Sequence, residues 1–205
     1  MASQSDIERT VLEAIYKRRA VRSYQPGKLE EGTIRKLLDA AVHAPTAIHE
    51  EPWIFAVIQD AATLKRFSDR AKTLNLDEAS RHRDLLKAPG AATSGDHLLR
   101  MLADPAFNIF YNASTLIVIC GKPLSQYVTA DCWLAAENLM LAAYAMGLGT
   151  CCIGFSMPYL NTPEAKAELG IPAQATAFAP IIVGVPSGTP PSVPRKPPEI
   201  SRWIK

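Results

Sequence analysis

The sequence predicts a single folded domain that combines α-helices with β-strands. A length of 205 residues suits one domain. Several segments carry apolar residues at the three- and four-residue spacing of a helix, and three short runs are rich in the β-branched residues that favour strands. Hydrophobic residues make up 48% of the chain and charged residues 20%, which is enough apolar surface for a core and excludes a wholly disordered chain.

Two helices are expected near the N-terminus. Ser5 followed by Glu8 is a capping-box pattern, and apolar residues at helical spacing predict a helix from Asp6 to Lys17. The second helix should end near His43, because Pro45 disfavours a helical conformation in the residue before it. The apolar face of this second helix consists of Ile34, Leu37, Leu38 and Ala41.

Three apolar runs predict strands, namely Trp53–Ile58, Thr115–Cys120 and Ala179–Val185. Between the first two, Asp60–Asn108 is polar and helical in composition but is broken at Pro89–Gly90 and at Gly95. We interpret Asp60–Asn108 as an irregular helical excursion that acts as a lid.

A long buried helix is predicted by the almost uniformly apolar segment Cys132–Met146, which is too short for a membrane span. Thr129 or Asp131 can cap its start, and Gly147 ends it. Pro163–Leu169 predicts a further short helix.

Charge and cysteine content exclude several classes of protein. A net charge of +2 argues against a dedicated nucleic-acid binder. The four cysteines lack the Cys-x-x-Cys spacing of a zinc site, so no metal site is expected. Residues Met1–Glu8 are polar and contain no apolar core of a signal peptide. We therefore expect a cytoplasmic protein with reduced thiols and no membrane contact.

Four segments carry groups suited to ligand binding. Lys17–Arg22 holds three arginines that match phosphate oxygens, although such residues also complement a helix C-terminus. Ala44–Trp53 is a proline-stiffened loop, and Gly147–Phe155 is glycine-rich. The latter is not a dinucleotide fingerprint, because Cys152 takes the third glycine position. Arg195 belongs to a basic pair within a proline-rich tail.

The order and spacing of these segments resemble the nitroreductase family of flavoproteins. That family has an Arg-Arg-Ser-x-Arg-like segment and, further on, an Ala-Pro-Ser-x-x-Asn-x-Gln-Pro-Trp-like segment. A Gly-x-Gly-Thr/Ser-Cys-x-x-Gly-Phe-like segment follows a long helix, and an Arg-x-Pro lies near the C-terminus. The resemblance covers nearly the whole chain apart from Asp60–Asn108.

The resemblance implies an α+β fold with a mainly antiparallel central sheet flanked by helices. It implies one FMN-binding domain over residues 1–205, with a variable lid at 60–108 and a proline-rich extended arm at 186–205 that is exchanged in a homodimer. It also implies an FMN-dependent oxidoreductase in which NADH or NADPH reduces the flavin through N5. A small electrophilic acceptor, such as a nitroaromatic or a quinone, then takes the electrons in a ping-pong cycle.

Site roles follow from the matching positions. Arg18 and Arg19 would bind the FMN phosphate with Arg195 beneath it, and Ala20, in place of serine, would offer only its backbone N–H. Arg22 would lie near the flavin N1–C2=O edge, where a cation stabilises the charge of the reduced ring.

The remaining positions would contact the ring. Cys151 and Cys152 would pass beside it as inert packing, and the N–H groups of Ile153 and Gly154 would face N5 and O4. No dedicated acid–base residue is then needed, because the cofactor carries the chemistry.

The second subunit would contribute a loop to the site, through Pro45, Thr46 and Ala47. His49 stands where the family has asparagine and Glu51 where it has glutamine, and Glu51 should point away from the phosphate or pair with an arginine. His49 predicts that flavin affinity changes between about pH 6 and 8.

Two other functions remain open from the sequence. The same motifs would serve a flavin-binding sensor or carrier without turnover. The proline-rich tail could also be a ligand for SH3-type domains.

Overall fold

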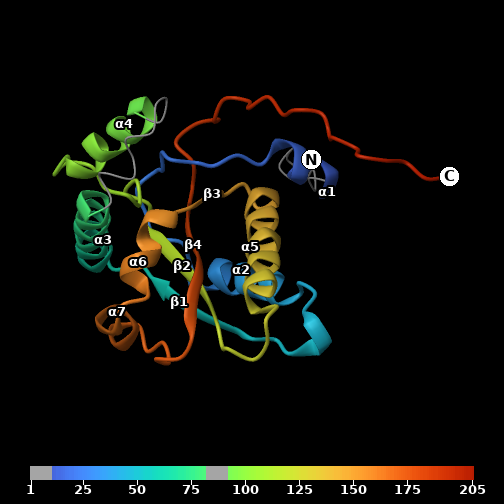
Figure 1. Cartoon of the computed structure of the whole chain (residues 1–205), viewed down its shortest axis with the longest axis horizontal. Helices are drawn as coiled ribbons and strands as arrows, with labels where there is room; N and C mark the ends of the chain where they lie inside the picture. The colour runs from blue at the N-terminus through green and yellow to red at the C-terminus, as the bar shows by residue number, and fades with distance from the viewer. Residues whose placement is uncertain (1–10, 82–91) are drawn as a thin grey trace, which may run out of the picture.

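The computed structural model describes residues 11–81 and 92–205, except for the side chains of residues 92–96. A four-stranded antiparallel sheet lies between two layers of helices (Figure 1). Its strands are β1 (Trp53–Ile58), β2 (Thr115–Gly121), β3 (Gly149–Cys152) and β4 (Thr176–Gly184), in the spatial order β1-β2-β4-β3. The predicted fold class is therefore confirmed.

The central strand β2 is buried along its whole length. Successive side chains of a strand point to opposite faces. Leu116 and Val118 accordingly join the core under α3 (Ala61–Arg81), whereas Ile117 and Ile119 join the core under α5 (Val128–Ala145). This double burial explains why the strand reads as a continuous apolar run.

On one face of the sheet, α5 packs against α2 (Glu31–Val42). The predicted cap of α5 is wrong. The helix starts at Val128, so Thr129 lies inside it, and the carboxylate of Asp131 accepts a hydrogen bond from the Ala47 N–H at 3.3 Å instead. The predicted end is confirmed, because Gly147 turns the chain with a φ of 76°.

The other face is covered by α3, α6 (Met157–Leu160) and α7 (Pro163–Glu168), with α4 (Ala92–Ala103) beyond them. The predicted irregular excursion is wrong in its first half, because α3 is one continuous helix of 21 residues. Asp60 caps it by accepting the Thr63 N–H at 2.7 Å. The predicted break at Pro89–Gly90 lies outside the described residues, and the predicted break at Gly95 is wrong, because α4 runs through this position.

Helix α1 and the C-terminal arm lie on the outside of the sheet and its helices. Helix α1 spans Val11–Lys17, while the predicted capping box of Ser5 and Glu8 and the first turn from Asp6 lie outside the described residues. After β4 the chain continues as an extended arm that leaves the body beyond α1 (Figure 1). No helix in the described residues is long and apolar enough to cross a membrane.

Candidate functional site

The segment from Arg18 to Tyr24 forms the floor of the candidate site. It runs alongside β3, where the Val21 N–H donates to the Thr150 carbonyl at 2.9 Å and Ala20 forms a parallel bridge with the same residue. A Cβ on Gly149 would lie 2.6 Å from the Val21 side chain. Glycine at position 149 is therefore what lets this segment approach the sheet so closely.

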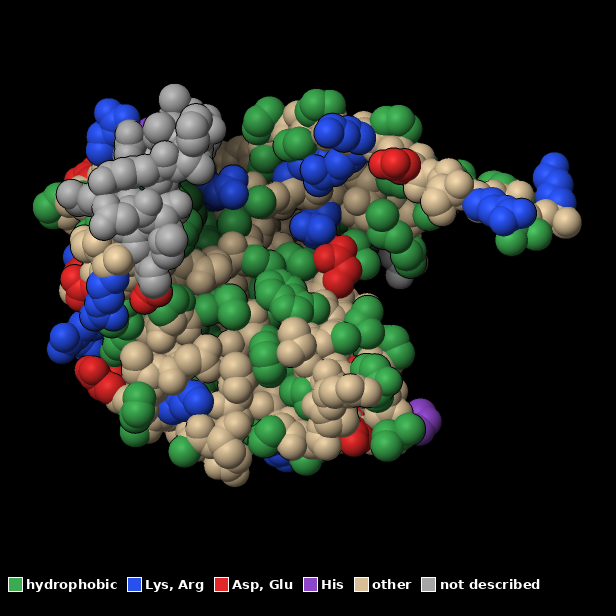
Figure 2. Space-filling model, viewed as in Figure 1, with side chains coloured by type: hydrophobic (Ala, Val, Ile, Leu, Met, Phe, Trp, Pro, Cys, Tyr) green, Lys and Arg blue, Asp and Glu red, His purple; other side chains and the backbone are tan. Residues whose placement is uncertain are grey.

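Three adjoining hollows follow this segment. The first, of about 410 Å³, lies between Lys17–Arg19, the end of α5 and the arm. The second, also about 410 Å³, lies between Ala20–Ser23 and Ser187–Pro191. The third, of about 290 Å³, shares Arg22 with the second. Lys and Arg side chains gather on the face where α1 and the arm lie (Figure 2).

Two arginines at the first hollow have unused hydrogen-bonding capacity. The Nε atoms of Arg18 and Arg19 are buried and have no partner in the described part of the chain. Arg18 Nη2 lies 3.3 Å from Glu137 Oε1, and Arg19 Nη1 donates to the carbonyls of Tyr16 and Arg18, at 2.7 Å each. With Lys17 nearby, cations outnumber carboxylates here, which suits an anionic group with several oxygens.

Aromatic side chains form the wall of the third hollow. Phe107 and Tyr111 meet edge to face with ring centroids 5.7 Å apart, and Phe155 lines the same hollow. Arg22 lies over the Tyr111 ring, 5.8 Å from its centroid. Sequence reasoning missed Phe107 and Tyr111, because both lie in or beside a segment interpreted only as a lid.

Cys151 and Cys152 line the third hollow from β3. Burial raises the pKa of Cys152 to about 11, and its Sγ lies 3.7 Å from Met140 Sδ. Burial also raises the pKa of Cys151, although the Arg22 guanidinium beside it acts in the opposite direction. Both thiols are therefore protonated at neutral pH, as poor nucleophiles.

The two predicted backbone donors differ in this structure. The Ile153 N–H donates to the Pro180 carbonyl at 2.9 Å and is thus occupied within the sheet. Gly154 opens the short 3-10 helix η2 (Gly154–Ser156), whose first N–H groups have no partner inside the helix by geometry. Of the two, the Gly154 N–H is the one placed to serve a ligand in the third hollow.

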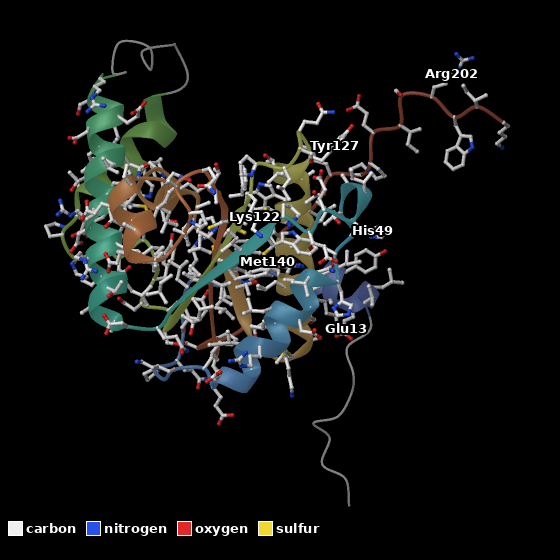
Figure 3. All side chains as sticks on the ribbon, turned by 90° about the horizontal axis from the view of Figure 1, so that it is seen from below. Glu13, His49, Lys122, Tyr127, Met140 and Arg202 are labelled. Atoms are coloured by element: carbon white, nitrogen blue, oxygen red, sulfur yellow. The ribbon has the colours of Figure 1, made fainter. Side chains whose placement is uncertain are left out.

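The predicted loop at positions 45–49 does not line any of the three hollows. It includes η1 (Ala47–His49) and is held at the start of α5 by the Ala47–Asp131 hydrogen bond, whereas Arg18 contacts Glu137 in the middle of α5. These two contacts are six residues apart on the helix, a rise of about 9 Å, and none of the three hollows is lined by Pro45, Thr46, Ala47 or His49. His49 lies at the outer edge of the molecule (Figure 3).

This loop also has an unusual backbone. Ile48 has a φ of 47°, His49 of 59° and Glu51 of 45°. A left-handed conformation is rare for a β-branched residue such as Ile48 and costs on the order of 1–3 kcal/mol. The Ile48 side chain is nevertheless 86% exposed in the single chain. Glu51 is exposed as well.

Arg195 lies three residues beyond Ser192, the last arm residue at the first hollow, and is exposed. A single chain therefore brings together Arg18, Arg19, Ala20, Arg22 and the 151–154 segment, but not Arg195 or the 45–49 loop. The described residues contain no cluster of three His, Cys, Asp or Glu side chains that could hold a metal ion.

An α+β fold with an arginine-lined hollow beside an aromatic pocket is suited to binding an anionic, flat ligand, and comparison with known proteins identifies the family. The model of the Nitroreductase family matches residues 15–185. The chain belongs to this family, as predicted from its motifs.

Individual relatives agree. A protein of Archaeoglobus fulgidus, whose name joins NADH dehydrogenase and NAD(P)H nitroreductase, is 31% identical over 180 residues, covering 85% of this chain and 84% of its own. Nitroreductase NfnB of Mycolicibacterium smegmatis is 25% identical over 81% of this chain and 79% of its own. A nitroreductase of Bacteroides fragilis, solved with bound FMN, superposes with a TM-score of 0.74 at 24% identity, over 95% of this chain and 97% of its own.

Proposed function

We propose that this protein is an FMN-dependent oxidoreductase that uses NADH or NADPH to reduce a small electrophilic acceptor, such as a nitroaromatic or a quinone. One observation carries the proposal. Three adjoining hollows run from two guanidinium groups whose Nε atoms have no partner in the described residues, past Arg22, to an aromatic pocket. Such a row offers an anion site at one end and a site for a flat ring at the other.

The residues present fit the FMN phosphate. Buried guanidinium nitrogens without partners cost free energy, and phosphate oxygens would satisfy the Nε atoms of Arg18 and Arg19. The Ala20 backbone N–H lies at the second hollow and could take part, although its methyl group adds no donor. Arg195 would complete this set only if the arm folds back or comes from a second chain.

At the other end, the protein would bind and orient the ring. When bound, FMN supplies the chemistry by accepting a hydride from the nicotinamide and passing electrons to the acceptor. Gly154 would donate its N–H toward N5 and O4 of the ring, and the Arg22 guanidinium would stabilise negative charge at the N1–C2=O edge. Protonated Cys151 and Cys152 would pack beside the ring without forming bonds to it.

A homodimer would complete the site. Helices α1 and α5 expose apolar side chains, namely Val11, Leu12, Ile15, Tyr16, Trp133 and Leu134. Within the described residues, one buried carboxylate oxygen each of Glu50 and Asp131 lacks a partner near the start of α5, and the Nε atoms of Arg18 and Arg19 lack partners further along the helix. A two-fold pairing that sets α5 against its copy would bring these opposite charges together, with the partner loop at the arginines.

The arm and the lid complete the proposal. Val193, Ile200, Trp203 and Ile204 are exposed on an arm that leaves the body, which suits an arm exchanged between subunits. The domain would thus be one FMN-binding unit over residues 1–205, with 60–108 shaping acceptor access and 186–205 clasping the partner. A cytoplasmic location fits the four free cysteines.

The test is a visible spectrum of the purified protein with added FMN, followed by anaerobic NADH or NADPH. A bound flavin that bleaches, and recolours when a nitroaromatic or quinone is added, supports the proposal. A bound flavin that neither nucleotide bleaches would indicate a flavin sensor or carrier. Failure to bind flavin would contradict the proposed function altogether.

A further inference from the structure

Helix α3 carries three polar side chains on one face that is otherwise apolar. Ser68, Lys72 and Asn75 follow the i, i+4, i+7 spacing that places residues on one side of a helix. Ser68 and Lys72 are buried among Leu64 and Phe67, where polar groups are retained only with hydrogen-bond partners. The identity of those partners is informative.

Each of the three side chains binds the backbone of a residue that lines the third hollow. Ser68 Oγ accepts the Ile109 N–H at 3.0 Å. Lys72 Nζ donates to the Phe107 carbonyl at 2.8 Å and to the Asp104 carbonyl at 2.9 Å.

The third member acts on the opposite wall. Asn75 Nδ2 donates to the Phe155 carbonyl at 2.8 Å, and also to the Ala71 carbonyl of its own helix at 2.7 Å. One helix therefore holds Phe107 and Phe155, which reach the hollow from segments 48 residues apart in the chain.

These bonds extend to the cation at the hollow. Phe107 contacts Tyr111 edge to face, and the Tyr111 ring lies under Arg22. A displacement of the 107–109 backbone would therefore move both aromatic rings and the surroundings of the guanidinium. The α3 side chains touch neither ring directly through their polar atoms, so they act through the backbone that they hold.

We propose that Ser68, Lys72 and Asn75 are positioning residues that set the shape of the third hollow and thereby the enzyme's preference among acceptors. This proposal rests on the proposed function for its consequence, but the holding of the walls is a property of the chain alone. It assigns to α3 the role of a fixed support for the walls around the flavin ring and the acceptor that reacts with it, in place of a movable lid.

The decisive variant is Asn75→Asp, which keeps the size of the side chain but cannot donate to the Phe155 carbonyl. Its matched control is Asn161→Asp. Asn161 Nδ2 likewise donates to the carbonyl four residues before it, Met157, and to a distant one, Ala177, at 3.0 Å each, but Asn161 does not line the hollow. Lys72→Gln tests the wall formed by Phe107. If Lys72→Gln does not fold, Asn75→Asp alone decides the test.

The first readout needs no cofactor. Amide hydrogen exchange of the full chain should speed up at residues 153–156 in Asn75→Asp and at residues 104–109 in Lys72→Gln. In Asn161→Asp, exchange at both walls should match the wild type. Unchanged exchange at the walls of both variants would overturn the proposal.

The second readout uses the FMN-loaded protein with NADPH or NADH. We compare kcat/KM for 4-nitrobenzoate, a planar ring, with kcat/KM for ferricyanide, a compact ion that needs no aromatic pocket. The ratio should change about tenfold in Asn75→Asp and stay constant in Asn161→Asp. If the wild type reduces both acceptors and Asn75→Asp has the same ratio of the two kcat/KM values as the wild type, the proposed effect on acceptor preference is refuted. A wild type without flavin would refute the proposed function, and the exchange measurement would still decide whether α3 holds the walls.

Discussion

Arg18 lies against Glu137, with Arg18 Nη2 3.3 Å from Glu137 Oε1, while the Nε of the same guanidinium is buried with no partner among residues 11–81 and 92–205. The chain itself therefore satisfies only part of the hydrogen-bonding capacity of Arg18. Glu137 comes from the middle of α5 and holds the guanidinium at the edge of the first hollow. The carboxylate orients Arg18 but also cancels part of the charge that a phosphate would use.

Replacing Glu137→Gln should therefore strengthen FMN binding. Because the pair is partly exposed, its attraction is worth at most about 1 kcal/mol, so we expect a two- to fivefold lower dissociation constant at low salt. Quenching of flavin fluorescence measures this, and the gain should shrink as salt screens the charges. Glu164→Gln, which breaks an ion pair with Arg70 on the other helix layer, should change nothing. Weaker binding in Glu137→Gln would mean that orientation of Arg18 outweighs charge.

Gly149→Ala should weaken flavin binding and lower stability. The new methyl group would lie 2.6–2.8 Å from Val21, so the arginine-bearing segment would have to shift away from β3. Such overpacking costs about 1–3 kcal/mol. Gly188→Ala is the control, because Gly188 also lines the first two hollows but has open space around its Cβ position. Thermal unfolding and FMN titration of both variants check this, and equal behaviour would contradict the close-approach argument.

Ile48→Asn should weaken the proposed dimer without unfolding the subunit. Asparagine tolerates the left-handed conformation that Ile48 adopts, so backbone strain falls while the exposed apolar side chain is lost. If Ile48 is buried against the partner, the loss of about 1.5–3 kcal/mol raises the dimer dissociation constant by tenfold or more.

Sedimentation over a range of concentrations measures this constant. Leu74→Asn removes an exposed apolar side chain from α3 and should leave assembly unchanged. Dimers of Ile48→Asn as tight as the wild type would place the loop outside the interface.

Stability should fall as the pH rises above about 9, in part because of Cys132. Burial raises the pKa of this thiol from 9.0 to about 12. Between these values the unfolded chain loses the thiol proton while the folded chain keeps it, so folding becomes less favourable as the pH rises. Cys132→Ala should lose less stability than the wild type between pH 8 and pH 11.

Denaturant unfolding at several pH values gives this slope. Val128→Ala, a neighbouring truncation in the same core without a titrating group, should keep the wild-type slope. A wild-type slope in Cys132→Ala would mean that other groups account for the loss.

Much of the fold follows from local pattern. The predicted strands at 53–58 and 115–120 match β1 and β2, and the apolar 132–146 segment lies within or next to α5. Strand β3 was not predicted, because Gly149 beside Gly147 indicated a turn. The β-prone residues Thr150–Cys152 were the available signal. Strand β4 begins at Thr176, earlier than predicted, where Asn161 pairs with both polar backbone groups of Ala177.

The site was predictable only where it is contiguous in sequence. Arg18, Arg19 and Arg22 stand out as a cluster, and the glycine-rich segment leads to Gly154. The aromatic wall and its supports are not contiguous, since Lys72 reaches Phe107 only once α3 is packed on the sheet. Nor could spacing reveal that the Ile153 N–H is taken by Pro180 across the sheet.

The arm has a consequence for how long a ligand stays bound. Its first residues border the first two hollows, and its backbone is held at the start by the Gln25 side chain, which donates to the Pro186 carbonyl at 3.0 Å, and by the Ser187 N–H, which donates to the Ser23 carbonyl at 3.0 Å. Beyond Ser187 no backbone hydrogen bond joins the arm to the described residues of the chain. The arm would therefore cover one side of a ligand bound at Arg18 and could detach from the body beyond Ser187. The dissociation rate of the ligand would then depend on how fast the arm detaches, so a partner that binds the distal part of the arm would slow dissociation without contacting the ligand.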